Sequence, residues 1–166
     1  FAKNGWDLTG IELINPATSP RLEEYASLLF ELRKSKGMTE EEAKKTALIP
    51  NYFGTLMIKS GHADGMVSGA NHSTADTVRP ALQIIKSAHK DRAVSSFLVM
   101  VSNDKPYVFS DCAITINPSA KELADIALET SLSAEKFGIE PKVAMLSFST
   151  YGSGKGEQVD KVVEAT

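Results

Sequence analysis

The most constraining feature of the sequence is a strand-like segment that leads through a glycine-rich loop into a helix-like segment. The apolar run at residues 143–148 has the length and composition of a buried strand. Residues 151–156 then contain three glycines, and Val159, Val162 and Val163 follow at helical spacing. Strand, loop and helix in this order are the repeating unit of folds with a parallel sheet. We therefore expect an α/β fold with a parallel sheet.

Helix signals dominate the first half of the chain. An apolar face indicates a helix over about residues 20–36 that ends at Gly37, and its members are Leu22, Tyr25, Leu28, Leu29 and Leu32. Thr39 and Glu42 have the spacing of a capping box, which predicts a second helix. Pro50 is placed to open a third helix that stops at Gly61.

The middle of the chain is predicted to hold a short strand and a helix that contains a proline. Residues 65–69 are an apolar stretch between glycines, which favours a brief buried strand, although five residues do not exclude a loop. A helix is expected over about residues 75–86, where Pro80 should bend it or mark a start within it. Residues 87–92 are polar and are the best candidate for a boundary between domains.

The second half is predicted to mix strands and helices. Residues 94–101 and 107–109 have strand composition, with a turn at residues 103–106 between them. Asn117 is the expected cap of the next helix, with Pro118 at its first position. That helix should end at Gly138, and its expected apolar face consists of Leu123, Ile126, Ala127, Ala134 and Phe137.

Composition narrows the possible classes of protein. A formal net charge of −3 argues against a nucleic-acid surface. No apolar run is long enough for a membrane-spanning helix, so we expect no membrane partner. The single cysteine, Cys112, excludes an internal disulfide, and a cytoplasmic location is the default expectation. The three histidines share no metal-ligand spacing with one another or with Cys112, so no metal site is predicted.

Two loops have the composition of anion sites. Glycines at residues 151–156 let a backbone approach a ligand, and the following helix offers free N–H groups at its start. The loop matches neither dinucleotide nor P-loop patterns, and a loop without a ligand is equally compatible with it. In the other loop, Ser73 and Thr74 precede a helix and are either caps or phosphate contacts. Arg79, one to two turns into that helix, is placed to offer a bidentate fork to phosphate.

Two further residues have plain structural explanations. Arg33 ends a predicted helix, where a cation suits the helix dipole. Cys112 follows Asp111, whose charge disfavours a thiolate, and we interpret the cysteine as a small buried apolar residue.

Longer motifs resemble the phosphate acetyltransferase (phosphotransacetylase) family, which belongs with the phosphate acetyl/butyryltransferases. The resemblance covers essentially the whole chain in register. The segments that carry it are residues 31–34 with Gly37, residues 64–70, residues 72–86, residues 109–113 with Asn117 and Pro118, and residues 143–150 with the glycine-rich loop. Motifs of this length make a chance match very improbable.

The resemblance implies an enzyme that moves an acetyl group between acetyl phosphate and coenzyme A, with inorganic phosphate as the other substrate or product. Coenzyme A is then a substrate, and no tightly bound cofactor and no metal are expected. The implied fold is like that of the isocitrate and isopropylmalate dehydrogenases, with two α/β domains, a cleft between them and a homodimeric assembly. Residues 1–91 would be the latter part of the first domain, and residues 92–166 the beginning of the second.

The resemblance also implies roles for individual residues. Arg33 and Arg79 match the family's functional arginines. Ser73 and Thr74 match positions that contact the acyl phosphate, and Ser149, Thr150 and Tyr151 match residues that line the site. Cys112 matches a cysteine near the site that is not regarded as an acyl-carrying nucleophile.

The chain also departs from the family pattern. The family has a further motif toward its C-terminus, with a serine, an arginine and an aspartate proposed to bind substrate and deprotonate the thiol, and this chain stops before it. We therefore interpret the chain as an internal fragment and expect little or no activity from it alone. Three alternatives stay open: a butyryl phosphate enzyme, a non-catalytic acetyl-CoA-binding regulatory module, and a dehydrogenase that shares the fold.

Overall fold

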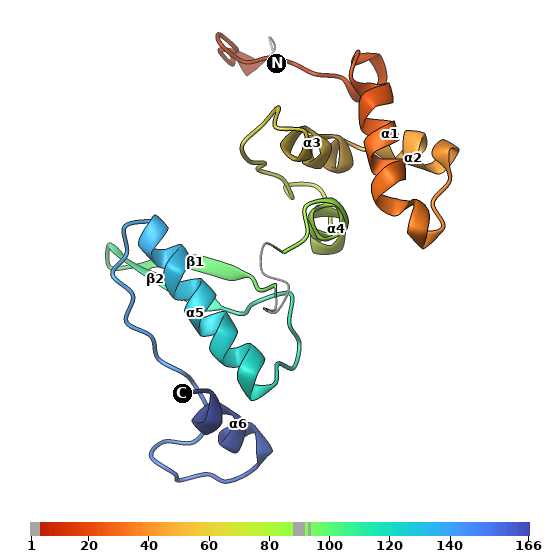
Figure 1. Cartoon of the computed structure of the whole chain (residues 1–166). Coiled ribbons are helices and arrows are strands. Elements are labelled where there is room, and N and C mark those ends of the chain that lie inside the picture. Colours follow the sequence, from red (N-terminus) through yellow and green to blue (C-terminus); the bar gives the residue numbers. More distant parts are fainter. Residues whose placement is uncertain (1–3, 88–91, 93) are drawn as a thin grey trace. The chain divides into compact units, whose positions relative to one another are not determined.

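The computed structural model describes residues 4–87, 92 and 94–166, and it divides the chain into two compact units. The first comprises Phe1–Lys86 and the second Ser87–Thr166 (Figure 1). Residues 88–91 of the predicted linker lie outside the described residues. In the described part of the chain, no helix combines the length and the apolar character needed to cross a membrane.

The first unit is helical. Its α-helices are α1 (Leu22–Arg33), α2 (Glu40–Ala47), α3 (Pro50–Lys59) and α4 (Thr74–Ile84), and its 3-10 helices include η2 (Pro16–Thr18) and η3 (Lys34–Lys36). The core forms where α1 packs against α2 and α3. Tyr25 is fully buried there, with its ring 4.9 Å from that of Phe53 between centroids and its hydroxyl 2.8 Å from Nδ1 of His62.

The predicted end of the first helical segment and the predicted starts of α2 and α3 are confirmed, while α1 begins at Leu22 and α3 ends at Lys59. Gly37 ends the first helical segment with a φ of 87°, a left-handed conformation that costs glycine little. Thr39 and Glu42 form the complete capping box at the start of α2. Pro50 is the first residue of α3. The helix around Pro80 runs from Thr74 to Ile84 with the proline inside it, so Pro80 does not mark a separate start.

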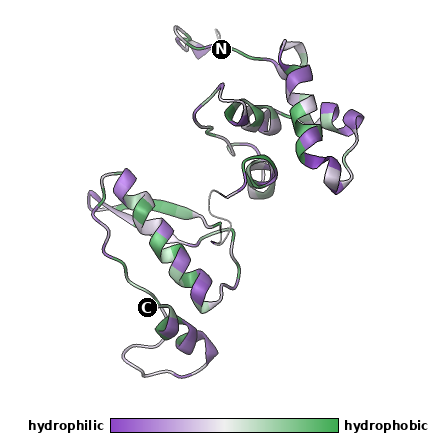
Figure 2. Cartoon of the chain, viewed as in Figure 1, coloured by the Kyte–Doolittle hydropathy of each residue, from purple (hydrophilic) through white to green (hydrophobic). Residues whose placement is uncertain are grey.

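The second unit joins one hairpin to two helices. The strands β1 (Phe97–Ser102) and β2 (Lys105–Ser110) pair antiparallel, with Val99 opposite Val108. The helix α5 (Ala120–Lys136) packs on β2, and α6 (Glu157–Ala165) packs on α5. Hydrophobic and hydrophilic residues alternate around α5, as expected for an amphipathic helix (Figure 2). Its buried residues are Ile126 and Ala134.

Local signals in this unit also predicted the structure well. The hairpin turn falls at Asn103 and Asp104, both with positive φ, as a two-residue type I′ hairpin turn requires. Gly138 follows α5 in a left-handed conformation. The predicted cap at Asn117 is wrong, because Ser119 caps α5 and forms a capping box with Glu122. Both residues offer a suitable side-chain oxygen, and the glutamate three residues after Ser119 makes it the better cap.

The α/β class is confirmed, but the predicted parallel sheet is wrong for the residues described. Among residues 4–87, 92 and 94–166 the sheet consists of β1 and β2 alone. Residues 65–69 and 143–148 form no strand, and Val67, Leu146 and Phe148 are largely exposed. Apolar composition marks a segment that a sheet can bury, yet a strand forms only where a neighbouring strand supplies hydrogen-bond partners.

Candidate functional site

Ser73 begins α4 and acts as its cap. Its Oγ accepts a hydrogen bond from the backbone N–H of Asp76 at 3.1 Å and donates to Oδ2 of Asp76 at 2.7 Å. Thr74 is the first residue of the helix. The capping interpretation of Ser73 is thus confirmed, and its contact with phosphate stays a prediction.

Arg79 projects from the same helix, one turn beyond Asp76. Its side chain is 55% exposed, and its Nη1 lies 3.6 Å from Oδ1 of Asp76. A guanidinium group with several donors and a single distant carboxylate contact retains hydrogen-bonding capacity. Arg79 is therefore able to bind an anion from solvent without unfolding its surroundings.

Arg33 lies at the end of α1, as predicted, and is partly buried. Its Nε is buried, and no partner for it occurs among the residues that the structure describes. A buried donor without a partner carries a free-energy cost, which an incoming acceptor would relieve. The cation also lies in the last turn of α1, where its interaction with the negative end of the helix dipole is favourable.

The charges of both arginines act on the side chain of Tyr52. The phenol, on α3, donates to Oε1 of Gln83 on α4 at 2.9 Å. Burial raises the pKa of Tyr52, while the positive charges of Arg79 and Arg33 oppose the rise. Both guanidinium charges thus act on one phenol, and the helix that carries Tyr52, α3, packs against both α1 and α4. Arg33 and Arg79 stand on α1 and α4, and these two helices and α3 pack against one another.

Sequence reasoning missed Tyr52. It lies two residues after the helix-opening Pro50 and beside the apolar Phe53, so no motif distinguished it. The signal that identifies it is spatial, since its hydrogen-bond partner Gln83 is 31 residues distant along the chain.

Cys112 lies in a loop of the second unit that Asp111 organises. The carboxylate of Asp111 accepts hydrogen bonds from Ser96 Oγ and from backbone N–H groups that include those of Ser96 and Thr115. Partial burial opposes the charged form, but these donors outweigh it and hold the pKa of Asp111 well below its usual range.

The prediction that Cys112 is buried is wrong, because its side chain is exposed, with Sγ 3.4 Å from Oγ of Ser96. Hydrogen bonds to the carboxylate of Asp111 fix the backbone on both sides of Cys112, and they need no burial of the thiol.

The glycine-rich loop is closed by Ser149. Its Oγ accepts from the N–H of Gly154 at 2.9 Å and donates to the carbonyl of the same residue at 3.2 Å. The N–H of Thr150 donates to Oγ of Ser153, and the side chain of Tyr151 is fully exposed. Ser149, Thr150 and Tyr151 therefore share one loop. The helix α6 follows this loop and has Gly156 as its N-cap.

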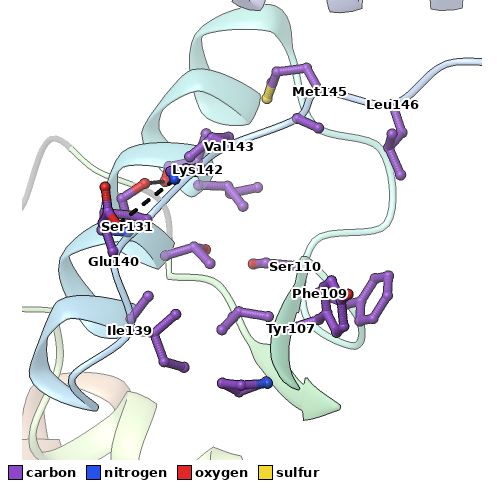
Figure 3. A pocket seen from close by; sticks show the side chains of 18 of the residues that line it. Tyr107, Phe109, Ser110, Ser131, Ile139, Glu140, Lys142, Val143, Met145 and Leu146 are labelled. Atoms are coloured by element: carbon purple, nitrogen blue, oxygen red, sulfur yellow. Dashed lines mark hydrogen bonds and ion pairs between the residues drawn. The ribbon is translucent and has the colours of Figure 1, made fainter. Parts of the chain in front are cut away.

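A cavity of about 490 Å³ lies elsewhere in the second unit. It is bounded by β2, α5 and residues 139–146, with apolar side chains such as Val143 and Leu146 around it (Figure 3). The ion pair between Lys142 and Glu140, at 3.8 Å, lies at one side (Figure 3). None of the predicted site residues lines this cavity. Its walls are mostly apolar, which does not favour phosphate.

The predicted site residues thus form two groups. Arg33, Ser73, Thr74 and Arg79 belong to the first unit, and Cys112, Ser149, Thr150 and Tyr151 belong to the second. In residues 4–87, 92 and 94–166, no three His, Cys, Asp or Glu side chains are placed to hold a metal ion. The arrangement in the first unit offers two cations and hydroxyls, which is chemistry for binding an anion.

Comparison with known proteins identifies the family. Residues 1–166 match the family described as "Phosphate acetyl/butaryl transferase". The chain belongs to this family, so the resemblance seen in the sequence is confirmed.

Individual relatives agree with this assignment. The chain is 51% identical over 165 residues to the phosphate acetyltransferase of Helicobacter pylori, covering 99% of this chain and 32% of that protein. It is 51% identical over 166 residues to the phosphate acetyltransferase of Clostridium acetobutylicum, and the match covers 96% of this chain and 50% of that protein.

Among solved structures, a phosphotransacetylase from Streptococcus pyogenes matches with a TM-score of 0.86 and 51% identity, over 99% of this chain and 50% of that one. The EutD phosphotransacetylase from Staphylococcus aureus matches with a TM-score of 0.85 and 50% identity, over 99% of this chain and 49% of that one. The chain therefore spans about half the length, or less, of the relatives it matches.

Proposed function

We propose that the whole protein transfers an acetyl group reversibly between acetyl phosphate and coenzyme A. The observation that carries the proposal is that Arg33 and Arg79 stand on helices that pack against one another, with Arg79 one to two turns beyond the Ser73-capped start of α4. Membership of the phosphate acetyl/butyryltransferase family supports it. Guanidinium groups and the free N–H groups at the start of a helix both suit the phosphate of an acyl phosphate.

The chemistry follows from the substrates. The thiolate of coenzyme A attacks the carbonyl carbon of acetyl phosphate, the carbon–sulfur bond forms, and the bond to the phosphate oxygen breaks. Inorganic phosphate leaves with the electron pair. Negative charge builds on the carbonyl oxygen and on the departing phosphate, so fixed donors near both accelerate the step. We assign removal of the thiol proton to a residue outside these 166.

In this proposal Arg79 binds the phosphate and stabilises its developing charge. Arg33 supplies the second cation, and Ser73 and Thr74 contact the acyl phosphate. Ser149, Thr150 and Tyr151 line the site from the second unit, and Cys112 lies near it without carrying the acyl group. No metal and no tightly bound cofactor take part in these steps.

We propose further that residues 1–91 and 92–166 are parts of two α/β domains of an isocitrate dehydrogenase-like fold with a cleft between them. The division of the chain between Lys86 and Ser87 supports this. The resemblance also leads us to propose a homodimeric, cytoplasmic enzyme whose partners are its small substrates rather than nucleic acid or membrane.

The direct test is to give the intact protein coenzyme A and acetyl phosphate and to monitor thioester formation by the absorbance of the thioester. We expect a fast reaction that phosphate reverses. Butyryl phosphate is the matched alternative substrate, and faster turnover with it would assign a butyryltransferase. A folded protein that binds acetyl-CoA but turns over neither acyl phosphate would contradict the proposal and favour a regulatory module.

A further inference from the structure

A buried amide in the first unit compensates for the proline in α4. Pro80 has no N–H, so the carbonyl of Asp76, four residues earlier, lacks its usual partner within the helix. Asn51 on α3 supplies the missing donor: its Nδ2 lies 3.2 Å from that carbonyl. Asn51 is only 4% exposed.

The other end of the same amide holds the loop before α4. Oδ1 of Asn51 accepts a hydrogen bond from Oγ of Ser68 at 2.6 Å. Ser68 and Asp76 stand on either side of Ser73 in the sequence. One side chain thus holds both ends of the segment that carries Ser73 and Thr74.

Asparagine suits this position because its two groups differ. The carbonyl of Asp76 can only accept, so it needs the NH₂ of the amide. The carbonyl oxygen of the amide is then left for the hydroxyl of Ser68. An aspartate would lack the donor, and an apolar residue would leave buried polar atoms without partners.

We propose that Asn51 is a positioning residue for the phosphate site, a role that rests on the proposed function. It contacts no substrate. Through Asp76 and Ser68 it fixes the first turn of α4, and with it the direction of Ser73, Thr74 and Arg79. A helix that contains a proline is otherwise free to bend at the turn that Pro80 leaves open.

The test uses the intact protein with Asn51→Leu and Ser68→Ala. We expect Asn51→Leu to lower kcat/KM for acetyl phosphate about 10- to 100-fold, because small misplacements of catalytic groups are costly. Ser68→Ala removes one of the two bonds and should have a smaller effect in the same direction. Thr55→Val is the matched control, since Thr55 is also buried on α3 and its hydroxyl donates to the carbonyl of Asn51 within the same helix.

A double-mutant cycle separates positioning from packing. Pro80→Ala restores an N–H to the carbonyl of Asp76, so Asn51→Leu should cost clearly less in that background. An equal cost in both backgrounds, or wild-type kcat/KM in Asn51→Leu, would overturn the proposal.

Amide hydrogen exchange over residues 69–79 gives a readout that does not depend on turnover. We expect faster exchange in Asn51→Leu and no change in Thr55→Val. If the wild type formed no thioester, the proposed function would fail. Hydrogen exchange, measured across the same double-mutant cycle of Asn51→Leu and Pro80→Ala, would still decide whether Asn51 holds this turn. Unchanged exchange in Asn51→Leu would overturn the positioning role itself.

Discussion

Arg79 and Asp76 face one another one turn apart on α4, with Nη1 of the arginine 3.6 Å from Oδ1 of the aspartate. The same carboxylate accepts a hydrogen bond from the hydroxyl of Ser73, whose Oγ lies 2.7 Å from Oδ2 of Asp76. One acidic side chain therefore engages two of the groups that we assign to phosphate. A phosphate that binds here has to displace Asp76 from these groups or share them with it.

This relationship predicts that Asp76→Asn strengthens phosphate binding. The substitution removes a negative charge beside the site and keeps an acceptor for Ser73. A unit charge about 4 Å away is worth roughly 1 kcal/mol in water, so inhibition by inorganic phosphate should tighten about fivefold. Product-inhibition kinetics measure this, with Asp125→Asn, a carboxylate of the second unit paired with Lys121, as the control. Weaker inhibition would show that Asp76 aids binding, for example by orienting Arg79.

Arg79→Ala should lower turnover of the intact protein by about 10²–10³, as loss of one transition-state donor typically does. Arg79→Lys should recover only part of the loss, because an ammonium cannot offer a bidentate fork. Initial rates of thioester formation measure both. Arg21→Ala, an exposed arginine at the start of α1, is the control. A near-normal rate in Arg79→Ala would remove Arg79 from the mechanism.

Tyr52→Phe should lower the free energy of unfolding by about 0.5–1.5 kcal/mol, the net value of one hydrogen bond, since it removes the bond to Gln83. Urea unfolding of the intact protein measures the change. Tyr107→Phe, a half-exposed tyrosine on β2, should leave stability unaltered. Equal stability of Tyr52→Phe and wild type would mean that solvent replaces the Gln83 contact without cost.

Asp111→Asn should destabilise the loop around Cys112 in a pH-dependent way. Because folding lowers the pKa of Asp111, its charged form stabilises the protein fully above the ordinary aspartate pKa of about 4. That contribution is lost as the pH falls from there toward the folded-state pKa. We expect a deficit on the order of 1 kcal/mol at pH 7, limited by solvent screening, that shrinks below about pH 4.

Urea midpoints of wild type and variant at pH 7, 5 and 3.5 test this dependence. Asp64→Asn, at an exposed position, controls for general effects of lost charge. A deficit in Asp111→Asn that stays constant down to pH 3.5 would contradict the role assigned to the ionised carboxylate.

The 166-residue chain by itself should show little or no thioester formation. The proposed mechanism assigns thiol deprotonation to a residue outside it, and the chain spans about half the length of its relatives or less. Assays of this chain beside the intact protein, at equal concentration and with folding checked by circular dichroism, measure the difference. Robust turnover by the shorter chain would place a complete site within these residues.

Much of the local structure was predictable because its causes are local. The capping box of Thr39 and Glu42, the left-handed Gly37 and the turn at Asn103 and Asp104 each depend on residues a few positions apart. The long motifs around Ser73 and Arg79 were equally sufficient to identify the family. The error at Asn117 was of the same local kind, since two neighbouring residues were both able to cap one helix.

The tertiary structure decided what depends on distant partners. Residues 143–148 have the composition of a strand, but no neighbouring strand pairs with them among the residues described. The sequence placed Arg33 and Arg79 on separate helices, and only tertiary packing brings these helices, α1 and α4, together with α3, which carries Tyr52. The contact of Asn51 with the carbonyl of Asp76 likewise spans 25 residues. Helix starts and ends follow from short-range bonds, whereas strand pairing and the site require contacts between residues that only folding brings together.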